Sequence, residues 1–250
     1  MAPDRKTFFS RAQSTLTTSA GPCALPIFYT DASLLGCIYL IEPSRARAML
    51  EGGPFEPLLF FGKAMVQLVV FEYRESSIGS YNELALAIEV KLRGRTTSPL
   101  RALLAPRRGD DHGSHIVNLP VTTEAACAAG KELWGFPKYV TTIDTDFGER
   151  SVRATLGGEL EIEFGPPGFM RTPGPPLVAI SIHDGRVLRT VVDTDHMLSW
   201  GGKATIRIVG EGPTAANVER LGLEASKPFL VFRTPRMRSI LPLGKDVGGS

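Results

Sequence analysis

Residues 151–164 read SVRATLGGELEIEF, and apolar and polar side chains alternate along both halves of this stretch. Val152, Ala154 and Leu156 form the apolar series before the Gly157-Gly158 pair, and the alternation resumes after it. Strict alternation places one face of a strand in the core and the other in water, and two glycines between such runs are typical of a tight hairpin turn. The stretch therefore predicts a β-hairpin with one buried face.

The same pattern continues outward from this hairpin. Residues 178–182 and 186–192 flank an Asp184-Gly185 turn and predict a second hairpin. Further strands are predicted over residues 37–41, 57–61, 65–73, 81–90, 115–121, 205–209 and 229–232. Helices are predicted only over residues 43–50 and 123–133, the second capped by Thr123 and ended by Gly135. So many strands favour a closed or nearly closed, mainly β architecture, because closure removes exposed edges.

The chain of 250 residues is long enough for a sizeable core, and no internal repeat divides it. Residues 1–22 are rich in serine and threonine and are predicted to form a disordered tail. We expect a single domain over residues 23–245, followed by a short tail over residues 246–250.

Composition excludes several classes of function. Lys and Arg number 28 against 26 acidic residues, so neither nucleic acid nor a membrane surface is an expected partner. No apolar run approaches the roughly 18 residues that cross a bilayer. Three cysteines without C-x-x-C spacing and the lack of a signal segment predict a cytoplasmic protein. His112 and His115 lie among Gly and Asp residues and are predicted in a solvated loop, so no metal site is expected.

Residues 130–139, GKELWGFPKY, carry the strongest chemical signal. A helix of small residues ends there in a turn that presents Lys138 among Trp134, Phe136 and Tyr139. Two interpretations follow from local chemistry. Lys138 either extends to water from the end of a strand, as most lysines do, or is held in apolar surroundings.

This segment resembles the Schiff-base segment of the acetoacetate decarboxylase family, through Gly130-Lys131-Glu132 and Gly135-Phe136-Pro137-Lys138. Residues 79–83, GSYNE, are similar to the Gly-x-Tyr-x-Glu strand that supplies the family's active-site glutamate, here Glu83. The resemblance covers most of the chain. It implies a mainly β (α+β) fold, a closed antiparallel β-cone or double barrel with a few short helices, around a buried pocket.

The resemblance also implies the chemistry. Lys138 and Glu83 become the expected catalytic residues, with Tyr81, Trp134, Phe136 and Tyr139 contacting the substrate. The substrate is expected to be a small oxo acid held as a covalent Schiff base with the lysine, so no cofactor is required. Members of the family usually assemble, which implies a homo-oligomer.

Schiff-base chemistry needs a neutral amine. A lysine with an ordinary pKa near 10.4 is only about 0.1% neutral at pH 7.5. Lowering that pKa by about 3 to 4 units costs the charged form about 4 to 5.5 kcal/mol, which burial or a neighbouring cation supplies. A neighbouring cation activates the lysine in acetoacetate decarboxylase itself. Family members commonly carry a second lysine beside the first, where this chain has Tyr139, so activation here would rest mainly on desolvation by aromatic walls.

A second departure concerns the substrate carboxylate. Decarboxylases of this family hold it with an arginine on an early strand, but residues 12–44 contain no Lys or Arg, and the matching position falls near Ser33. Arg74, Lys131, Arg233 and Arg236 are the candidates to replace it.

Three functions remain open. The first is decarboxylation of a β-oxo acid. The second is an aldolase-dehydratase or cyclase reaction on pyruvate or another 2-oxo acid in secondary metabolism. The third is a barrel that binds a ligand without catalysis.

Overall fold

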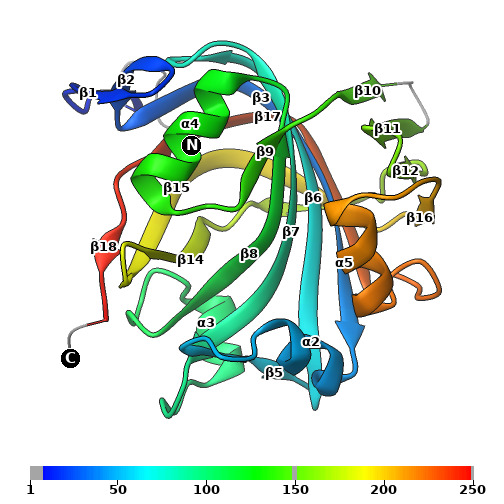
Figure 1. The fold of residues 1–250 in the computed structure, drawn as a ribbon. Coiled ribbons are helices and arrows are strands. Elements are labelled where there is room, and N and C mark those ends of the chain that lie inside the picture. Colours follow the sequence, from blue (N-terminus) through cyan, green and yellow to red (C-terminus); the bar gives the residue numbers. More distant parts are fainter. Residues whose placement is uncertain (1–7, 148–150, 249–250) are drawn as a thin grey trace.

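The computed structural model describes residues 8–147 and 151–248, and its centre is a closed β-barrel (Figure 1). Seven strands are hydrogen-bonded in the order β7-β6-β3-β17-β15-β14-β8, and β8 pairs back with β7 to close the sheet. All of these pairings are antiparallel except that of β14 with β8. The barrel strands are β3 (Ile27–Ile41), β6 (Lys63–Ser76), β7 (Tyr81–Leu92), β8 (His112–Val121), β14 (Leu177–His183), β15 (Arg186–Trp200) and β17 (Leu230–Leu241). The predicted mainly β, closed architecture is confirmed.

Short strands extend this sheet. They are β4 (Phe55–Pro57), β5 (Leu59–Phe60), β9 (Lys138–Val140), β13 (Met170–Pro173) and β18 (Lys245–Asp246). Of these, β9 runs parallel to β8, with Lys138 opposite Leu119. The β8 strand begins at His112, whose side chain is buried, so the prediction of a solvated loop for His112 and His115 is wrong. The Gly and Asp residues around the two histidines lie at the start of β8, and the strand continues from there into the barrel wall.

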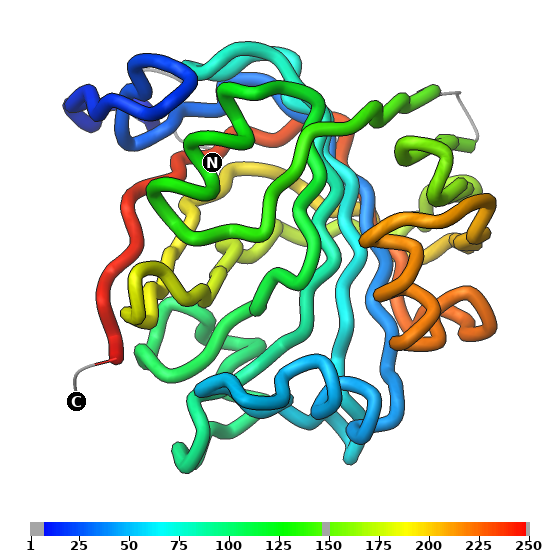
Figure 2. Tube along the Cα trace, in the orientation of Figure 1, coloured from blue at the N-terminus to red at the C-terminus, as the bar shows by residue number. Residues whose placement is uncertain are grey.

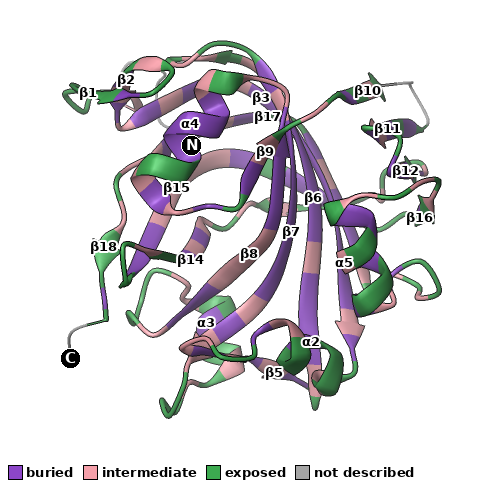
Figure 3. Cartoon of the chain, viewed as in Figure 1, coloured by how far each residue is buried: buried purple, intermediate pink, exposed green. Residues whose placement is uncertain are grey.

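The hairpin predicted from residues 151–164 belongs to a second sheet of four strands. These strands are β10 (Ile143–Phe147), β11 (Val152–Leu156), β12 (Leu160–Phe164) and β16 (Ala204–Ile208). Leu156 pairs with Leu160, and both turn glycines have the positive φ angles that such a turn requires, 46° and 76°. The apolar face of the hairpin packs in one core with Leu68 and Leu86 of the barrel wall. Figure 3 shows that the barrel strands consist mainly of buried and intermediate residues.

Four helices are assigned within residues 8–147 and 151–248. They are α2 (Pro43–Met49), α3 (Pro99–Leu104), α4 (Glu124–Trp134) and α5 (Pro213–Leu221). The predicted helices correspond to α2 and α4, and the Thr123 side chain accepts a hydrogen bond from the amide of Ala126 as a cap. Figures 1 and 2 show α4 over one end of the barrel and α3 toward the other. None of these helices is both long and apolar enough to cross a membrane.

Both segments predicted as tails contain ordered structure. A hairpin of β1 (Ser14–Thr18) and β2 (Gly21–Leu25) lies partly within residues 1–22, and Ser19 donates its amide proton to Glu132 of α4. Most β1 side chains are exposed, so backbone pairing forms this strand without an apolar face. At the other end, β18 pairs with β15 and Val247 is buried. Residues 1–7 and 249–250 of the predicted tails lie outside the described residues.

Candidate active site

Lys138 and Glu83 form a buried ion pair inside the barrel. The Lys138 Nζ atom lies 2.6 Å from Glu83 Oε2, and the two side chains are 6% and 9% exposed. Glu83 lies on β7 opposite Val121 of β8, and β9 pairs with the same end of β8. Strand pairing therefore brings together two side chains that are 55 positions apart in the sequence. The interpretation in which Lys138 extends to water is wrong for this structure.

A glycine in α4 provides the space for the lysine side chain. A Cβ atom at Gly130 would lie 2.3 Å from Lys138 Cε and 2.4 Å from its Cδ. Gly135, which ends the helix with a φ angle of 66°, also lies too close to the Ile182 carbonyl oxygen to accept a side chain. The two glycines of the Lys138 segment thus let the helix, the turn and the lysine pack closely.

Three tyrosines surround the carboxylate. The Tyr73 hydroxyl donates to Glu83 Oε1 at 3.4 Å, and the hydroxyls of Tyr29 and Tyr81 lie 2.8 Å apart. Burial, together with the nearby charge of Glu83, raises the pKa of all three phenols, so they keep their protons. The Lys138 Nζ atom also lies 5.7 Å from the centre of the Tyr81 ring. Tyr81 was expected here from the sequence, whereas Tyr29 and Tyr73 were not.

The ion pair borders a cavity of ≈ 270 Å³ whose wall includes residues of all seven barrel strands. Most of that wall is apolar. Five of the six predicted site residues line it, namely Lys138, Glu83, Tyr81, Trp134 and Phe136. The rings of Trp134 and Phe136 are stacked, and the Trp134 indole donates to the Pro242 carbonyl oxygen at 3.0 Å. The structure therefore brings these five predicted residues to the wall of one cavity.

Tyr139 does not line this cavity, so the structure does not place it with the other five predicted site residues. Adjacent residues of a strand point to opposite faces, so Tyr139 turns away from the cavity that Lys138 faces. Its hydroxyl lies 2.7 Å from Thr214 Oγ1 and donates to Glu159 Oε1 at 3.0 Å. Burial, together with the charge of Glu159, raises the Tyr139 pKa to about 12. Glu159 in turn accepts the backbone amide protons of Thr214 and Ala215 in the first turn of α5.

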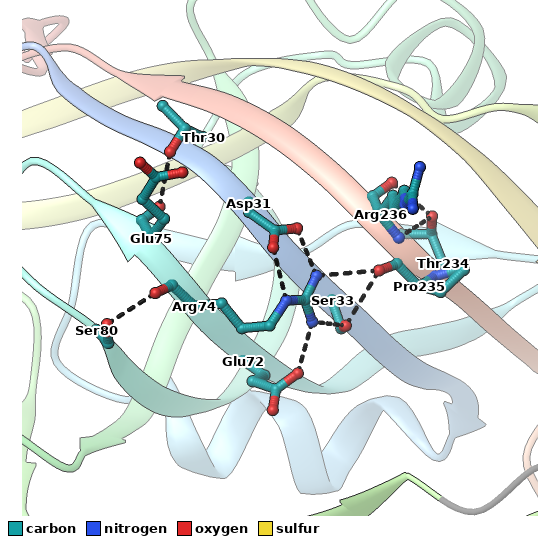
Figure 4. Close-up of polar contacts among 10 residues, drawn as sticks. All are labelled: Thr30, Asp31, Ser33, Glu72, Arg74, Glu75, Ser80, Thr234, Pro235 and Arg236. Carbon is teal, nitrogen blue, oxygen red and sulfur yellow. Dashed lines mark hydrogen bonds and ion pairs between the residues drawn. The ribbon is translucent and has the colours of Figure 1, made fainter.

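None of the four basic residues considered for carboxylate binding lines the cavity. Arg74 lies beside Ser33, but its guanidinium donates to Asp31 at 2.6 and 2.9 Å and to Glu72 at 2.6 Å (Figure 4). It also contacts Ser33 Oγ and the Pro235 carbonyl oxygen. Hydrogen bonds to Asp31 raise the Arg74 pKa further above its ordinary value. Arg74 thus joins β3, β6 and β17 as a structural cation.

Comparison with known proteins assigns the chain to a family. The model of the acetoacetate decarboxylase (ADC) family matches residues 13–162. None of the curated proteins that were compared matches the chain.

Solved structures share the fold. The acetoacetate decarboxylase of Legionella pneumophila is similar over 98% of this chain and 94% of its own, with a TM-score of 0.65 and 16% identity. An acetoacetate decarboxylase-like enzyme from Sphingomonas wittichii RW1 is similar over 88% and 92%, with a TM-score of 0.58 and 14% identity. The enduracididine biosynthesis enzyme MppR, complexed with the condensation product of pyruvate and imidazole 4-carboxaldehyde, is similar over 89% and 88%, with a TM-score of 0.53 and 13% identity. The family model covers more than half of the chain, and the chain belongs to the acetoacetate decarboxylase family.

Proposed function

We propose that this family member is a lyase that forms a Schiff base between Lys138 and an oxo acid, with Glu83 moving the protons and without a cofactor. The observation that carries the proposal is the buried contact of 2.6 Å between Lys138 Nζ and Glu83 Oε2 at the wall of an apolar cavity. A cavity that merely holds an apolar ligand has no need for this charged pair, because burying two ions costs several kcal/mol for each before their attraction is counted.

The first step is a proton transfer inside the pair. Moving one proton from Nζ to Oε2 turns two buried ions into an amine and a carboxylic acid, which an apolar cavity accommodates at lower cost. The amine then attacks the ketone carbon of the substrate. The oxygen of the resulting carbinolamine takes one proton from the attacking nitrogen and a second from Glu83, so it leaves as water and gives an iminium on Lys138.

The second step breaks the carbon–carbon bond to the carboxylate. The electron pair of that bond moves to the iminium nitrogen, so CO2 leaves and a neutral enamine remains. Protonation of the enamine carbon and hydrolysis by water release the ketone and restore the amine. The negative and positive charges cancel as CO2 departs, so apolar walls favour the transition state over the charged intermediate. Decarboxylation therefore does not depend on an arginine in the cavity.

A second candidate is the aldol or dehydration reaction of an enamine formed by loss of a proton instead of CO2. It is supported by the shared fold of MppR, which was solved with a condensation product of pyruvate and an aldehyde. The condensation product bound to MppR belongs to chemistry of this kind.

Product measurement separates these functions. Wild-type protein and Lys138→Met are incubated with acetoacetate, and with pyruvate plus an aldehyde, and CO2 and condensation products are quantified. Release of CO2 that requires Lys138 supports the decarboxylase, and aldehyde-dependent products support the aldolase. If neither mixture gives a product although the protein still binds the ligands, the function that remains is ligand binding without catalysis.

A further inference from the structure

A second polar group lies in the same cavity, far from the ion pair. Glu89 follows Glu83 by six residues on β7, and both line the cavity. Glu89 Oε1 accepts hydrogen bonds from the Gln67 amide nitrogen at 2.6 Å and from the Ser114 hydroxyl. The proposed reaction uses none of these three residues.

His112 adds an imidazole nitrogen without a partner to this group. It lines the cavity two residues before Ser114 on β8, and its residue is 3% exposed. Nδ1 lies 3.1 Å from Asp111 Oδ1, whereas Nε2 has no hydrogen-bond partner in the described chain. A buried polar atom in this state costs about 1–3 kcal/mol unless a ligand satisfies it.

The protonation of this group follows from its neighbours. Burial opposes ionisation of Asp111, but hydrogen bonds from Thr97 and His112 outweigh it and lower the Asp111 pKa. Its carboxylate is an acceptor for a proton on His112 Nδ1, so Nε2 is the ring nitrogen that is left to bind a ligand. Burial raises the Glu89 pKa despite the hydrogen bonds from Ser114 and Gln67, which favours a carboxylic acid with a proton to donate.

The space between the two polar groups is apolar. Ala85 and Ala87 line the cavity between Glu83 and Glu89, and their small side chains leave room beside β7. Six residues of strand span about 20 Å. The cavity volume of ≈ 270 Å³ is close to the lower limit of roughly 300–1,000 Å³ for sites of drug-sized ligands. A small oxo acid at Lys138 would leave the remote end of this space empty.

We propose that the substrate is an elongated oxo compound, with a carbonyl at Lys138, an apolar chain along β7 and a hydroxyl group at the remote end between Glu89 and His112. The carbonyl end rests on the proposed Schiff-base function, and the remote end rests on the second polar group alone. A hydroxyl fits because it both donates and accepts. It accepts from the Glu89 carboxyl and donates to Nε2 of His112.

The test compares three methyl ketones, which are the expected products of decarboxylation. Acetone, dodecan-2-one and the terminally hydroxylated form of dodecan-2-one are titrated into the full-length protein by calorimetry. We expect dodecan-2-one to bind more tightly than acetone, and its hydroxylated form at least tenfold more tightly again. Equal affinity of the two long ketones, or no binding of either, would overturn the proposal.

Variants locate the effect. Glu89→Leu and His112→Phe should each remove most of the preference for the hydroxyl, and Ser114→Ala provides a milder change if either fails to fold. Glu161→Gln, on the second sheet, is the matched carboxyl control and should keep the preference. A preference that survives all three cavity changes would contradict the assignment.

Borohydride trapping separates this inference from the proposed function. Acetone trapped on Lys138 without any effect of the hydroxyl supports the lyase and overturns the inference. A preference for the hydroxyl that depends on Glu89, without trapping of any ketone, supports the inference and removes the Schiff base.

Discussion

Replacing Gly130 with alanine should disable the site while leaving the barrel folded. The new Cβ atom would lie 2.3 Å from Lys138 Cε, whereas carbon atoms in contact lie about 3.5–4.0 Å apart. The lysine side chain must therefore move by more than about 1 Å. Because Nζ is held 2.6 Å from Glu83, this movement changes the geometry of the ion pair directly.

The expected losses can be estimated separately for rate and stability. A displacement of about 1 Å at a reacting group costs about 100-fold in rate. Overpacking costs about 1–3 kcal/mol of unfolding free energy, and alanine in a helix recovers about 0.5–1 kcal/mol relative to glycine. Gly130→Ala should therefore unfold at slightly lower urea concentration and react about 100-fold more slowly.

The assay is the initial rate of borohydride-dependent labelling by acetoacetate, with urea unfolding measured on the same samples. Lys131→Ala is the matched control, because it changes the next residue of α4 at an exposed position. It should label at the wild-type rate. Labelling of Gly130→Ala within threefold of wild type would refute the role given to the glycine.

Three further changes test other parts of the account. Glu83→Gln should slow turnover by about 100-fold or more, the usual contribution of a general acid or base, and an unchanged rate would remove Glu83 from the mechanism. Gly36→Ala should lower the unfolding free energy by about 1–3 kcal/mol in urea, because its Cβ would lie 2.3 Å from Phe232 Cζ; an unchanged midpoint would show that the ring moves freely. Burial lowers the His196 pKa to about 4, and the charge of Asp195 opposes this shift only in part. Between pH 6.5 and 4 the folded state therefore binds fewer protons than the unfolded state. The unfolding free energy should fall as the pH falls through that window, by up to about 3 kcal/mol more in wild type than in His196→Gln. Parallel pH profiles of urea unfolding for the two proteins would contradict this.

Local patterns located many of the strands but not their full length, since β3 (Ile27–Ile41) was predicted only over residues 37–41 and β17 (Leu230–Leu241) only over residues 229–232. The strand expected at residues 178–182 is β14 (Leu177–His183), and the hairpin at residues 151–164 has the expected turn. The two helices that were missed, α3 and α5, are short and each begins with a proline, at Pro99 and Pro213. Ser98 and Pro99 were a usable start signal for α3.

The interior of the barrel was harder to predict. On β7, Leu84, Leu86 and Ile88 pack in the outer core, while Glu83 and Glu89 face the cavity. Two carboxylates on one face of a strand normally indicate a solvated face. Here that face lines the cavity, and only closure of the sheet makes it internal. The pairing of Glu83 with Lys138 came from the family resemblance, because no local pattern encodes a contact across 55 positions.

Tyr139 is the one predicted site residue that the structure separates from the others, and strand alternation in the sequence indicates this separation. The sequence already placed Lys138 immediately before a strand, and neighbouring residues of a strand face opposite sides. Grouping Tyr139 with Trp134 and Phe136 relied on proximity in the sequence instead.

Identification of the lysine that reacts shows whether Lys138 forms the proposed Schiff base. The protein is incubated with acetoacetate and borohydride, digested, and mapped by mass spectrometry, with Lys138→Met in parallel. We expect one stable adduct, on the peptide that contains Lys138, and none in the variant. An adduct on another lysine, or no adduct at saturating ligand, would contradict it.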